Sequence, residues 1–125
     1  MVSRRSGFTL VELVVVLAII ALLLSIAVPN YVTRAAHAEE AVLHEDLRIV
    51  REALDKHFAD KGRYPDSLQA LVTERYLRAL PTDPLTRSDR TWVVVPPQDP
   101  LLGGVYDLHS GAPGNGSDGT PYAQW

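Results

Sequence analysis

The feature that most limits how this chain can fold is an apolar run near its N-terminus. Between Glu12 and Arg34 lie 21 consecutive residues without a charged side chain. The apolar stretch of residues 8–28 would be about 31 Å long as a helix, which matches the hydrocarbon core of a bilayer. A pair of arginines precedes this stretch, and positive charge ahead of such a run favours a cytoplasmic N-terminus. The sequence therefore predicts a segment that enters a membrane.

Glu12 is the exception within this apolar segment. An acidic residue near the centre of a membrane helix costs about 2.5–3.5 kcal/mol on insertion scales, and less near the interface. No lysine or arginine occurs in the next 21 positions, so this part of the helix supplies no basic partner. The sequence therefore predicts that a group on another chain pairs with Glu12.

The remainder of the chain is small. Of the 125 residues 46% are hydrophobic, but most of the large aliphatic residues lie in the apolar run. About 60 residues remain for a globular part, which is near the lower size at which a core stabilises itself. We expect the protein to depend on a membrane, on neighbouring subunits or on both.

Composition and spacing exclude several functions. The absence of cysteine excludes disulfides, zinc–thiolate sites and cysteine nucleophiles, and a formal net charge of −3 gives no global basic surface for nucleic acid. His37 and His44 would lie about 10 Å apart along a helix, too far to share one metal ion. A cluster of four acids is predicted to form a solvated helix face: Glu39, Glu40, Glu45 and Asp46. Without a nucleophile elbow or a phosphate loop, the chain is predicted not to be an enzyme.

A long helix is predicted from Phe8 to Asp60, about 80 Å in length. Pro29 lacks a backbone N–H and clashes with a preceding carbonyl, so we expect it to kink or locally melt the helix. In the second half, apolar residues recur every three or four positions and form one stripe, at Leu43, Leu47, Val50, Leu54 and Phe58. Gly62 is suited to the C′ position that ends the helix.

The C-terminal half predicts a small head, which makes the fold class α+β. Ser67–Glu74 is expected to be a short helix that starts with a capping box. Aromatic and β-branched residues predict strands at Thr91–Val95 and Gly104–His109. Four glycines between Gly111 and Gly119 predict a loop. The aromatic tail Tyr122–Trp125 is expected to pack back on the head or to join the sheet edge.

A motif of ten residues overlaps the start of the apolar run. It reads Arg4-Arg5-Ser6-Gly7-Phe8-Thr9-Leu10-Val11-Glu12-Leu13, and it resembles the class III signal of type IV pilins and type II secretion pseudopilins. The resemblance implies that a membrane aspartyl peptidase cuts between Gly7 and Phe8 and that Phe8 is then N-methylated. It also implies that Glu12, the fifth mature residue, helps subunits to dock, and that Pro29 stands at the family's helix-kinking position.

The chemistry of these residues agrees with the implied roles. Gly7 presents no side chain to a peptidase cleft. Cleavage would create an α-amine at Phe8, a cation in the same bilayer leaflet as Glu12. The carboxylate of one chain and the amine of the next would neutralise each other and fix the register between subunits, although the same two groups could also pair within one helix.

Short segments of the second half narrow the resemblance to the major pseudopilins of type II secretion. They are Gly62-Arg63-Tyr64-Pro65, Leu68-Gln69-Ala70-Leu71, Tyr76-Leu77, Leu80-Pro81, Asp83-Pro84 and Tyr106-Asp107-Leu108-His109-Ser110-Gly111. The resemblance implies a type IV pilin-like fold, in which a long N-terminal helix packs on a small antiparallel sheet with a Gly-rich C-terminal loop. It divides the chain into a cleaved leader (1–7), a transmembrane half-helix (8–30), an amphipathic half-helix (31–61) and a periplasmic head (62–125).

The implied function is that of a structural subunit of a periplasmic filament that drives protein export. The implied partners are further copies of the chain, minor pseudopilins, an inner-membrane assembly platform and prepilin peptidase. The implied location is the bacterial inner membrane, with one pass and the head in the periplasm. Two alternatives remain open. One is a type IV pilus subunit serving motility, adhesion or DNA uptake. The other is a periplasmic binding module that ordinary signal peptidase releases near Val28, after the small-x-small site Ser25-Ile26-Ala27.

Calcium is the one cofactor that the resemblance implies, because the C-terminal loop of pseudopilins often binds it. The candidate ligands here are Asp107, Ser110, Asn115, Ser117 and Asp118. The sequence departs from a calcium loop in that Asp118 is the only acid after Asp107, whereas Ca²⁺ takes six to eight oxygens, usually several from carboxylates. The alternative is a loop held by turns and by Trp125.

Overall fold

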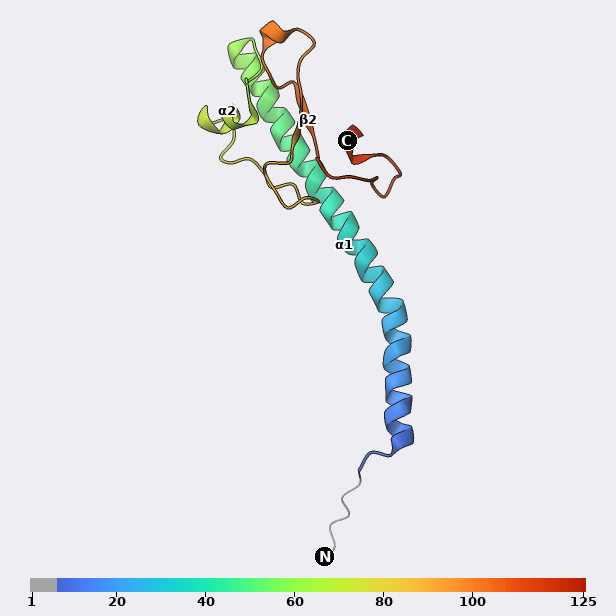
Figure 1. The fold of residues 1–125 in the computed structure, drawn as a ribbon. Coiled ribbons are helices and arrows are strands. Elements are labelled where there is room, and N and C mark those ends of the chain that lie inside the picture. The colour runs from blue at the N-terminus through green and yellow to red at the C-terminus, as the bar shows by residue number, and fades with distance from the viewer. Residues whose placement is uncertain (1–6) are drawn as a thin grey trace, which may run out of the picture. The chain divides into compact units, whose positions relative to one another are not determined.

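A computed structural model of the protein describes residues 7–125 (Figure 1). The chain divides into two compact units, with the boundary between Ala35 and Ala36. Helix α1 (Leu10–Lys61) contributes residues to both units, and the remaining elements all belong to the second unit, in which residues 62–125 form the head.

Helix α1 begins and ends within two residues of the predicted bounds. It continues through Pro29 without interruption, and the Thr33 hydroxyl donates to the Pro29 carbonyl at 3.0 Å. Local melting at Pro29 is therefore not seen, and the kink stays a prediction. The helix stops at Gly62, whose φ of +69° is suited to glycine and whose N–H donates to the Phe58 carbonyl at 2.8 Å. The predicted C′ role of Gly62 is confirmed.

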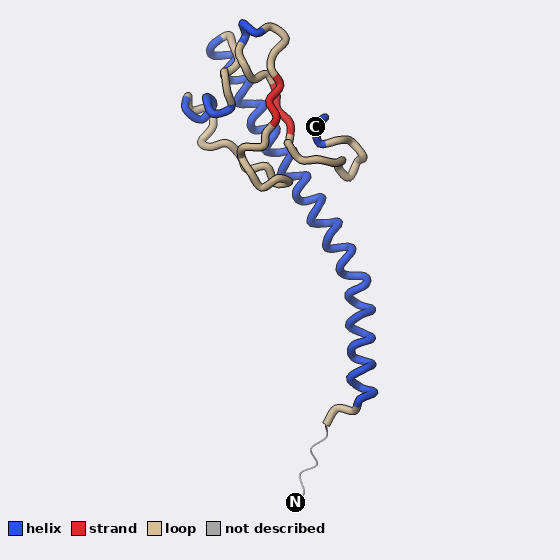
Figure 2. Tube along the Cα trace, viewed as in Figure 1, coloured by secondary structure: helices blue, strands red, loops and turns tan. Residues whose placement is uncertain are grey.

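The head combines helix α2 (Leu68–Thr73) with a two-stranded antiparallel sheet of β1 (Val93–Val95) and β2 (Asp107–His109). Ser67 caps α2, because its hydroxyl oxygen accepts the N–H of Ala70 at 3.2 Å. Figure 2 shows how small the sheet is and how much of the head is loop. Two short 3₁₀ helices, η1 (Pro100–Leu102) and η2 (Tyr122–Gln124), complete the head. The predicted α+β, pilin-like fold is confirmed.

Both strands are shorter than their sequence patterns suggest. Strand β1 starts two residues after Thr91, and β2 starts three residues after Gly104. The N–H groups of Gly104 and Val105 both donate to the carbonyl of Pro65, at 3.1 and 3.0 Å. These donors serve the segment that follows α1, so they are not available to a ladder with β1.

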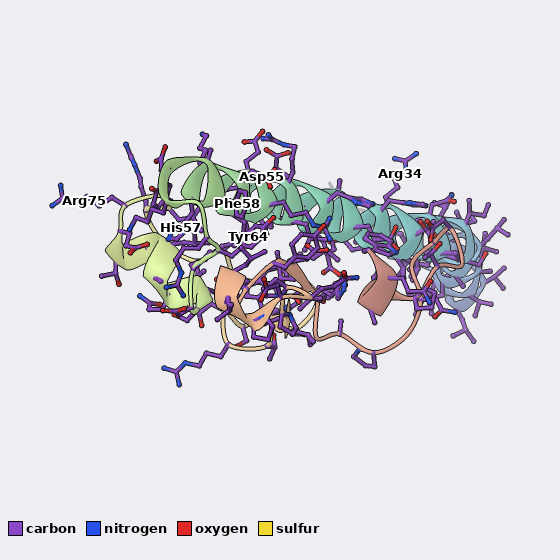
Figure 3. The ribbon with its side chains drawn as sticks, turned by 90° about the horizontal axis from the view of Figure 1, so that it is seen from above. Arg34, Asp55, His57, Phe58, Tyr64 and Arg75 are labelled. Carbon is purple, nitrogen blue, oxygen red and sulfur yellow. The ribbon has the colours of Figure 1, made fainter. Side chains whose placement is uncertain are left out.

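The hydrophobic core lies between the head and the C-terminal half of α1. The predicted stripe supplies Leu43, Leu47, Val50 and Leu54, all at most 1% exposed. Phe58, at the end of the stripe, is half-buried and packs on the Tyr64 ring, with centroids 4.6 Å apart (Figure 3). The head contributes the rest of the core, at Leu68, Leu71, Trp92, Val105 and Leu108.

This packing predicts a large cost for truncating β2 at its centre. Leu108 is fully buried, so Leu108→Ala should destabilise the head by about 2–5 kcal/mol and lower its melting temperature by about 10 °C or more. The control is Leu101→Ala, because Leu101 is 86% exposed and its truncation should change stability by no more than about 0.5 kcal/mol. Thermal unfolding of the full chain in detergent measures both, and equal losses would contradict the assigned core.

Candidate processing and assembly site

The predicted cleavage site lies in an open segment just before α1. Phe8 is 87% exposed, and a Cβ added to Gly7 would meet no atom of residues 7–125 within 4 Å. The fold itself therefore does not require glycine at position 7, and a requirement for it would come from a molecule that binds here. The two arginines of the motif, Arg4 and Arg5, and the rest of the predicted leader before Gly7 lie outside the described residues.

Glu12 lies in the first turn of α1, where it forms a capping box with Thr9. The Thr9 N–H donates to Glu12 Oε2 at 3.0 Å, and the Glu12 N–H donates to the Thr9 hydroxyl oxygen at 3.1 Å. This reciprocal pair satisfies two backbone donors that the helix start would otherwise leave free. The capping role of Thr9 was not predicted from the sequence, although the spacing Thr-x-x-Glu at a helix start is the signal of this motif.

The capping box gives the Glu12 carboxylate a hydrogen-bond partner but does not neutralise its charge. Glu12 Oε2 accepts a hydrogen bond from the Thr9 N–H of the same chain. This donor is a neutral backbone amide and not a cation. The negative charge is therefore not neutralised by these contacts. A positive partner such as a neighbouring amine would neutralise it at the membrane interface.

The apolar half of α1 presents its side chains outward. Its large apolar residues from Leu10 to Val28 are exposed, including Leu13, Leu17 and Leu24. One helix, α1, contains a stretch long and apolar enough to cross a membrane, and no part of that stretch is buried against the described chain. Such a surface is stable only in lipid or against other apolar helices.

The calcium candidates are engaged in other contacts. Asp107 Oδ1 accepts from Arg51 Nε at 2.8 Å, and the Ser110 hydroxyl donates to the buried Asp83 at 2.5 Å. Ser117 binds Glu40, and Asp118 accepts the N–H of Thr120 at 2.9 Å. Asn115 is paired in a backbone bridge with Pro121.

These contacts do not form the calcium site that the resemblance offers as one alternative. Between residues 7 and 125, no three or more His, Asp or Glu side chains lie close enough together to hold a metal ion. A cation, Arg51, already accompanies Asp107, which is the one strand acid among the candidates. The donor set therefore does not fit Ca²⁺.

Glu40 is the residue that sequence reasoning placed wrongly. It was expected on a solvated acidic face, but it is only 7% exposed. Ser117 donates to it from both its hydroxyl and its N–H, and the Tyr122 hydroxyl donates at 3.2 Å. The Ser117 hydroxyl bond is the main cause that holds the pKa of Glu40 below its usual 4.5, against the opposing effect of burial.

The lowered pKa of Glu40 predicts acid release of the C-terminal loop. A carboxylate whose pKa is lower in the folded state stabilises it fully above the unfolded pKa of about 4.5 and loses this contribution as the pH falls through the folded value. The indole N–H resonance of Trp125 should report this release in the protein in detergent micelles. Glu40→Gln should remove the acid transition, and an unchanged transition in that variant would assign it to another carboxylate.

His57 is buried between α1 and α2 (Figure 3). Its Nδ1 contacts the Arg63 carbonyl at 2.8 Å, and its Nε2 contacts Glu74 at 2.6 Å. Lys61 also binds Glu74 at 2.6 Å, and this bond is the main cause that lowers the pKa of Glu74. Both ring nitrogens are thus used within the head, which agrees with a packing role for this histidine and leaves no nitrogen for a metal.

Comparisons with known proteins identify the family. The model of the prokaryotic N-terminal methylation motif matches residues 2–28. The type II secretion system core protein G of Aeromonas hydrophila is 33% identical over 107 residues, which cover 86% of this chain and 74% of that protein. The protein of the same name from Escherichia coli K12 is 32% identical, covering 94% of this chain and 88% of its own length.

A third relative is similar over only half of this chain. The type IV major pilin protein PilA of Myxococcus xanthus is 38% identical over 63 residues, which are 50% of this chain and 29% of that protein. No solved structure matches the chain significantly. The similarity to core protein G, in contrast, spans the long helix and the head, so the chain belongs to the type II secretion core protein G family of pilin-like pseudopilins, which are structural proteins and not enzymes.

Proposed function

We propose that this chain is a structural subunit of a type II secretion pseudopilus that drives protein export. The observation that carries the proposal is the methylation motif, which runs from residue 2 to residue 28 and so includes the start of an apolar helix whose side chains are exposed. Prepilin peptidase removes residues 1–7 and methylates Phe8. Residues 8–30 then anchor the mature chain in the inner membrane by a single pass, while residues 31–61 and the head, 62–125, lie in the periplasm.

Two properties of the membrane half of α1 favour assembly: its exposed apolar side chains and the unneutralised charge of Glu12. Its apolar side chains leave lipid when helices pack against one another in the core of a filament. The Glu12 carboxylate pairs with the Phe8 amine of the adjoining subunit, which neutralises both charges and fixes the register. Because a charge in an apolar environment is costly without a partner, this pair favours one stagger of the helices over the others.

The proposal implies partners of four kinds. Further copies of the chain form the filament, minor pseudopilins join it, an inner-membrane platform assembles it, and prepilin peptidase processes each subunit. Support for this set comes from the similarity to core protein G and from the processing motif.

Intact-mass spectrometry of the mature protein tests the proposal. The expected product begins at Phe8 and carries one methyl group on its α-amine. A product that begins near Val28 would identify an ordinary signal peptide, and a product that retains residues 1–7 would identify a plain membrane anchor. Either result would contradict the proposal.

A type IV pilus subunit is the second candidate, because the chain is also similar to the pilin PilA over half of its length. Deleting the chromosomal copy separates the two functions. Loss of protein export with normal surface pili supports the pseudopilus, whereas loss of surface pili, motility or adhesion with normal export supports the pilus. The neighbouring genes give an independent indication, since a secretin and a secretion ATPase accompany the first system and a retraction ATPase the second.

A further inference from the structure

We propose that the Glu40 carboxylate locks the C-terminal loop, residues 111–119, onto α1, and that the head keeps this loop ordered without calcium. The proposal concerns the fold of the head and does not depend on the proposed function. It assigns to a side chain of α1 the structural role that the family resemblance would give to a bound metal ion.

The lock is built from donors that converge on one buried carboxylate. Glu40 Oε1 accepts the Ser117 N–H at 2.8 Å and the Tyr122 hydroxyl at 3.2 Å, while Glu40 Oε2 accepts the Ser117 hydroxyl at 2.5 Å. Ser117 thus engages both oxygens at once, which fixes its backbone and its side chain together. Hydrogen bonds to an ionised carboxylate are about twice as strong as neutral ones, so this contact joins residues 77 positions apart with high specificity.

The titratable groups around Glu40 are consistent with an anionic carboxylate. Tyr122 presents its hydroxyl to Glu40, and His37 Nδ1 lies 3.9 Å away on the same helix. The neighbouring acid Glu39 is half-exposed and is free to remain solvated. Each group that faces the carboxylate directly is a donor or a potential cation.

The aromatic tail closes the loop from the other side. Trp125 stacks on His44 of α1 with ring centroids 4.2 Å apart and an interplanar angle of 9°. Its indole N–H donates to the Thr120 carbonyl at 3.3 Å. A Cβ at Gly116 would overlap the Trp125 ring, so this position requires glycine for close approach rather than for flexibility.

The same contacts already occupy the carboxylates that would bind a calcium ion. A Ca²⁺ ion at the loop would have to displace the donors from Glu40 or separate Asp107 from Arg51, whose guanidinium also donates to the Trp125 carbonyl at 2.7 Å. Asp118, the remaining loop acid, closes a turn with Thr120. Arg51 and the donors to Glu40 thus already provide the positive potential that a metal would supply.

Hydrogen exchange of the full chain in detergent tests the lock. Glu40→Gln keeps the size of the side chain but removes its charge and turns one acceptor into a donor. It should speed exchange of the Ser117 amide about tenfold or more. Glu39→Gln removes the same charge one position earlier and should leave exchange of the loop unchanged. If Glu40→Gln prevents folding, Ser117→Ala removes only the hydroxyl bond and should give a smaller acceleration confined to the loop.

A second experiment tests whether calcium stabilises the C-terminal loop. Addition of CaCl₂ or of EDTA to the wild-type protein should leave the melting temperature and the loop exchange unchanged, and Asp118→Asn should not alter the response. A rise of the melting temperature with Ca²⁺ that Asp118→Asn abolishes would overturn the proposal in favour of a calcium loop. Unchanged loop exchange in a folded Glu40→Gln protein would overturn it as well.

Discussion

Gly7→Val should abolish maturation of the chain while leaving its fold and its membrane insertion intact. A Cβ added at this position meets no atom of the described residues within 4 Å, so we expect the head and α1 to keep their structure. A branched side chain next to the scissile bond would instead obstruct a peptidase cleft that has to receive an extended segment. We expect the variant to accumulate as a membrane protein that retains its first seven residues.

Mass spectrometry and membrane fractionation of cells that produce the variant measure this outcome. Glu12→Gln is the matched control, since it alters the motif five residues later and should still yield a product that begins at Phe8. Equal amounts of mature protein from Gly7→Val and from the wild type would contradict the assigned cleavage site.

Glu12→Ala should prevent filament formation while cleavage and insertion proceed normally. Loss of the carboxylate leaves the Phe8 amine of the adjoining subunit without a partner. If an unpaired charge in the apolar core of the filament costs roughly as much as one at the centre of a membrane helix, about 2.5–3.5 kcal/mol, the variant weakens each subunit contact about 100-fold. Such contacts repeat along a filament, so filaments should be absent by electron microscopy of sheared or overproducing cells.

The capping box makes a second substitution at this position informative. Glu12→Ala removes both the charge and the cap on the Thr9 N–H. Glu12→Gln retains an oxygen that can accept this N–H, because glutamine also serves at this position of a capping box, but it removes the charge. If both variants fail to assemble, the charge pair is responsible. If Glu12→Gln assembles like the wild type, the role of Glu12 is to cap the helix, and the charge-pair mechanism is wrong.

Elements with a strong local pattern were predicted well. The bounds of α1 follow from the uninterrupted apolar run, the stripe from Leu43 to Leu54 and the glycine at position 62. Helix α2 follows from its capping serine. The strands were predicted in the right places but too long, because two N–H groups of the second predicted strand are used by the carbonyl of Pro65, about 40 residues earlier in the chain, which no period-2 pattern reveals.

In the candidate site, too, the local motif was predicted from the sequence and the long-range contacts were not. Gly7, Phe8 and Glu12 were identified from the spacing of a short motif, and their roles stay predictions until the mature protein is measured. Thr9 was missed although its signal is local. Glu40 was predicted to be solvated because it is one of four acids close together in the sequence, and nothing in the sequence distinguishes it from the other three. In the structure it is Glu40 that accepts the hydrogen bonds of Ser117.

The sequence by itself determined that this chain has a long helix with an apolar half, an acid placed just inside it, and a small α+β head. These properties depend on residues that are neighbours along the chain, so length and periodicity are sufficient to establish them. Only the tertiary structure decided which acid is buried, what holds the C-terminal loop and which strand residues pair. Those outcomes depend on donors and acceptors that are far apart in sequence and that meet only when the head closes on α1.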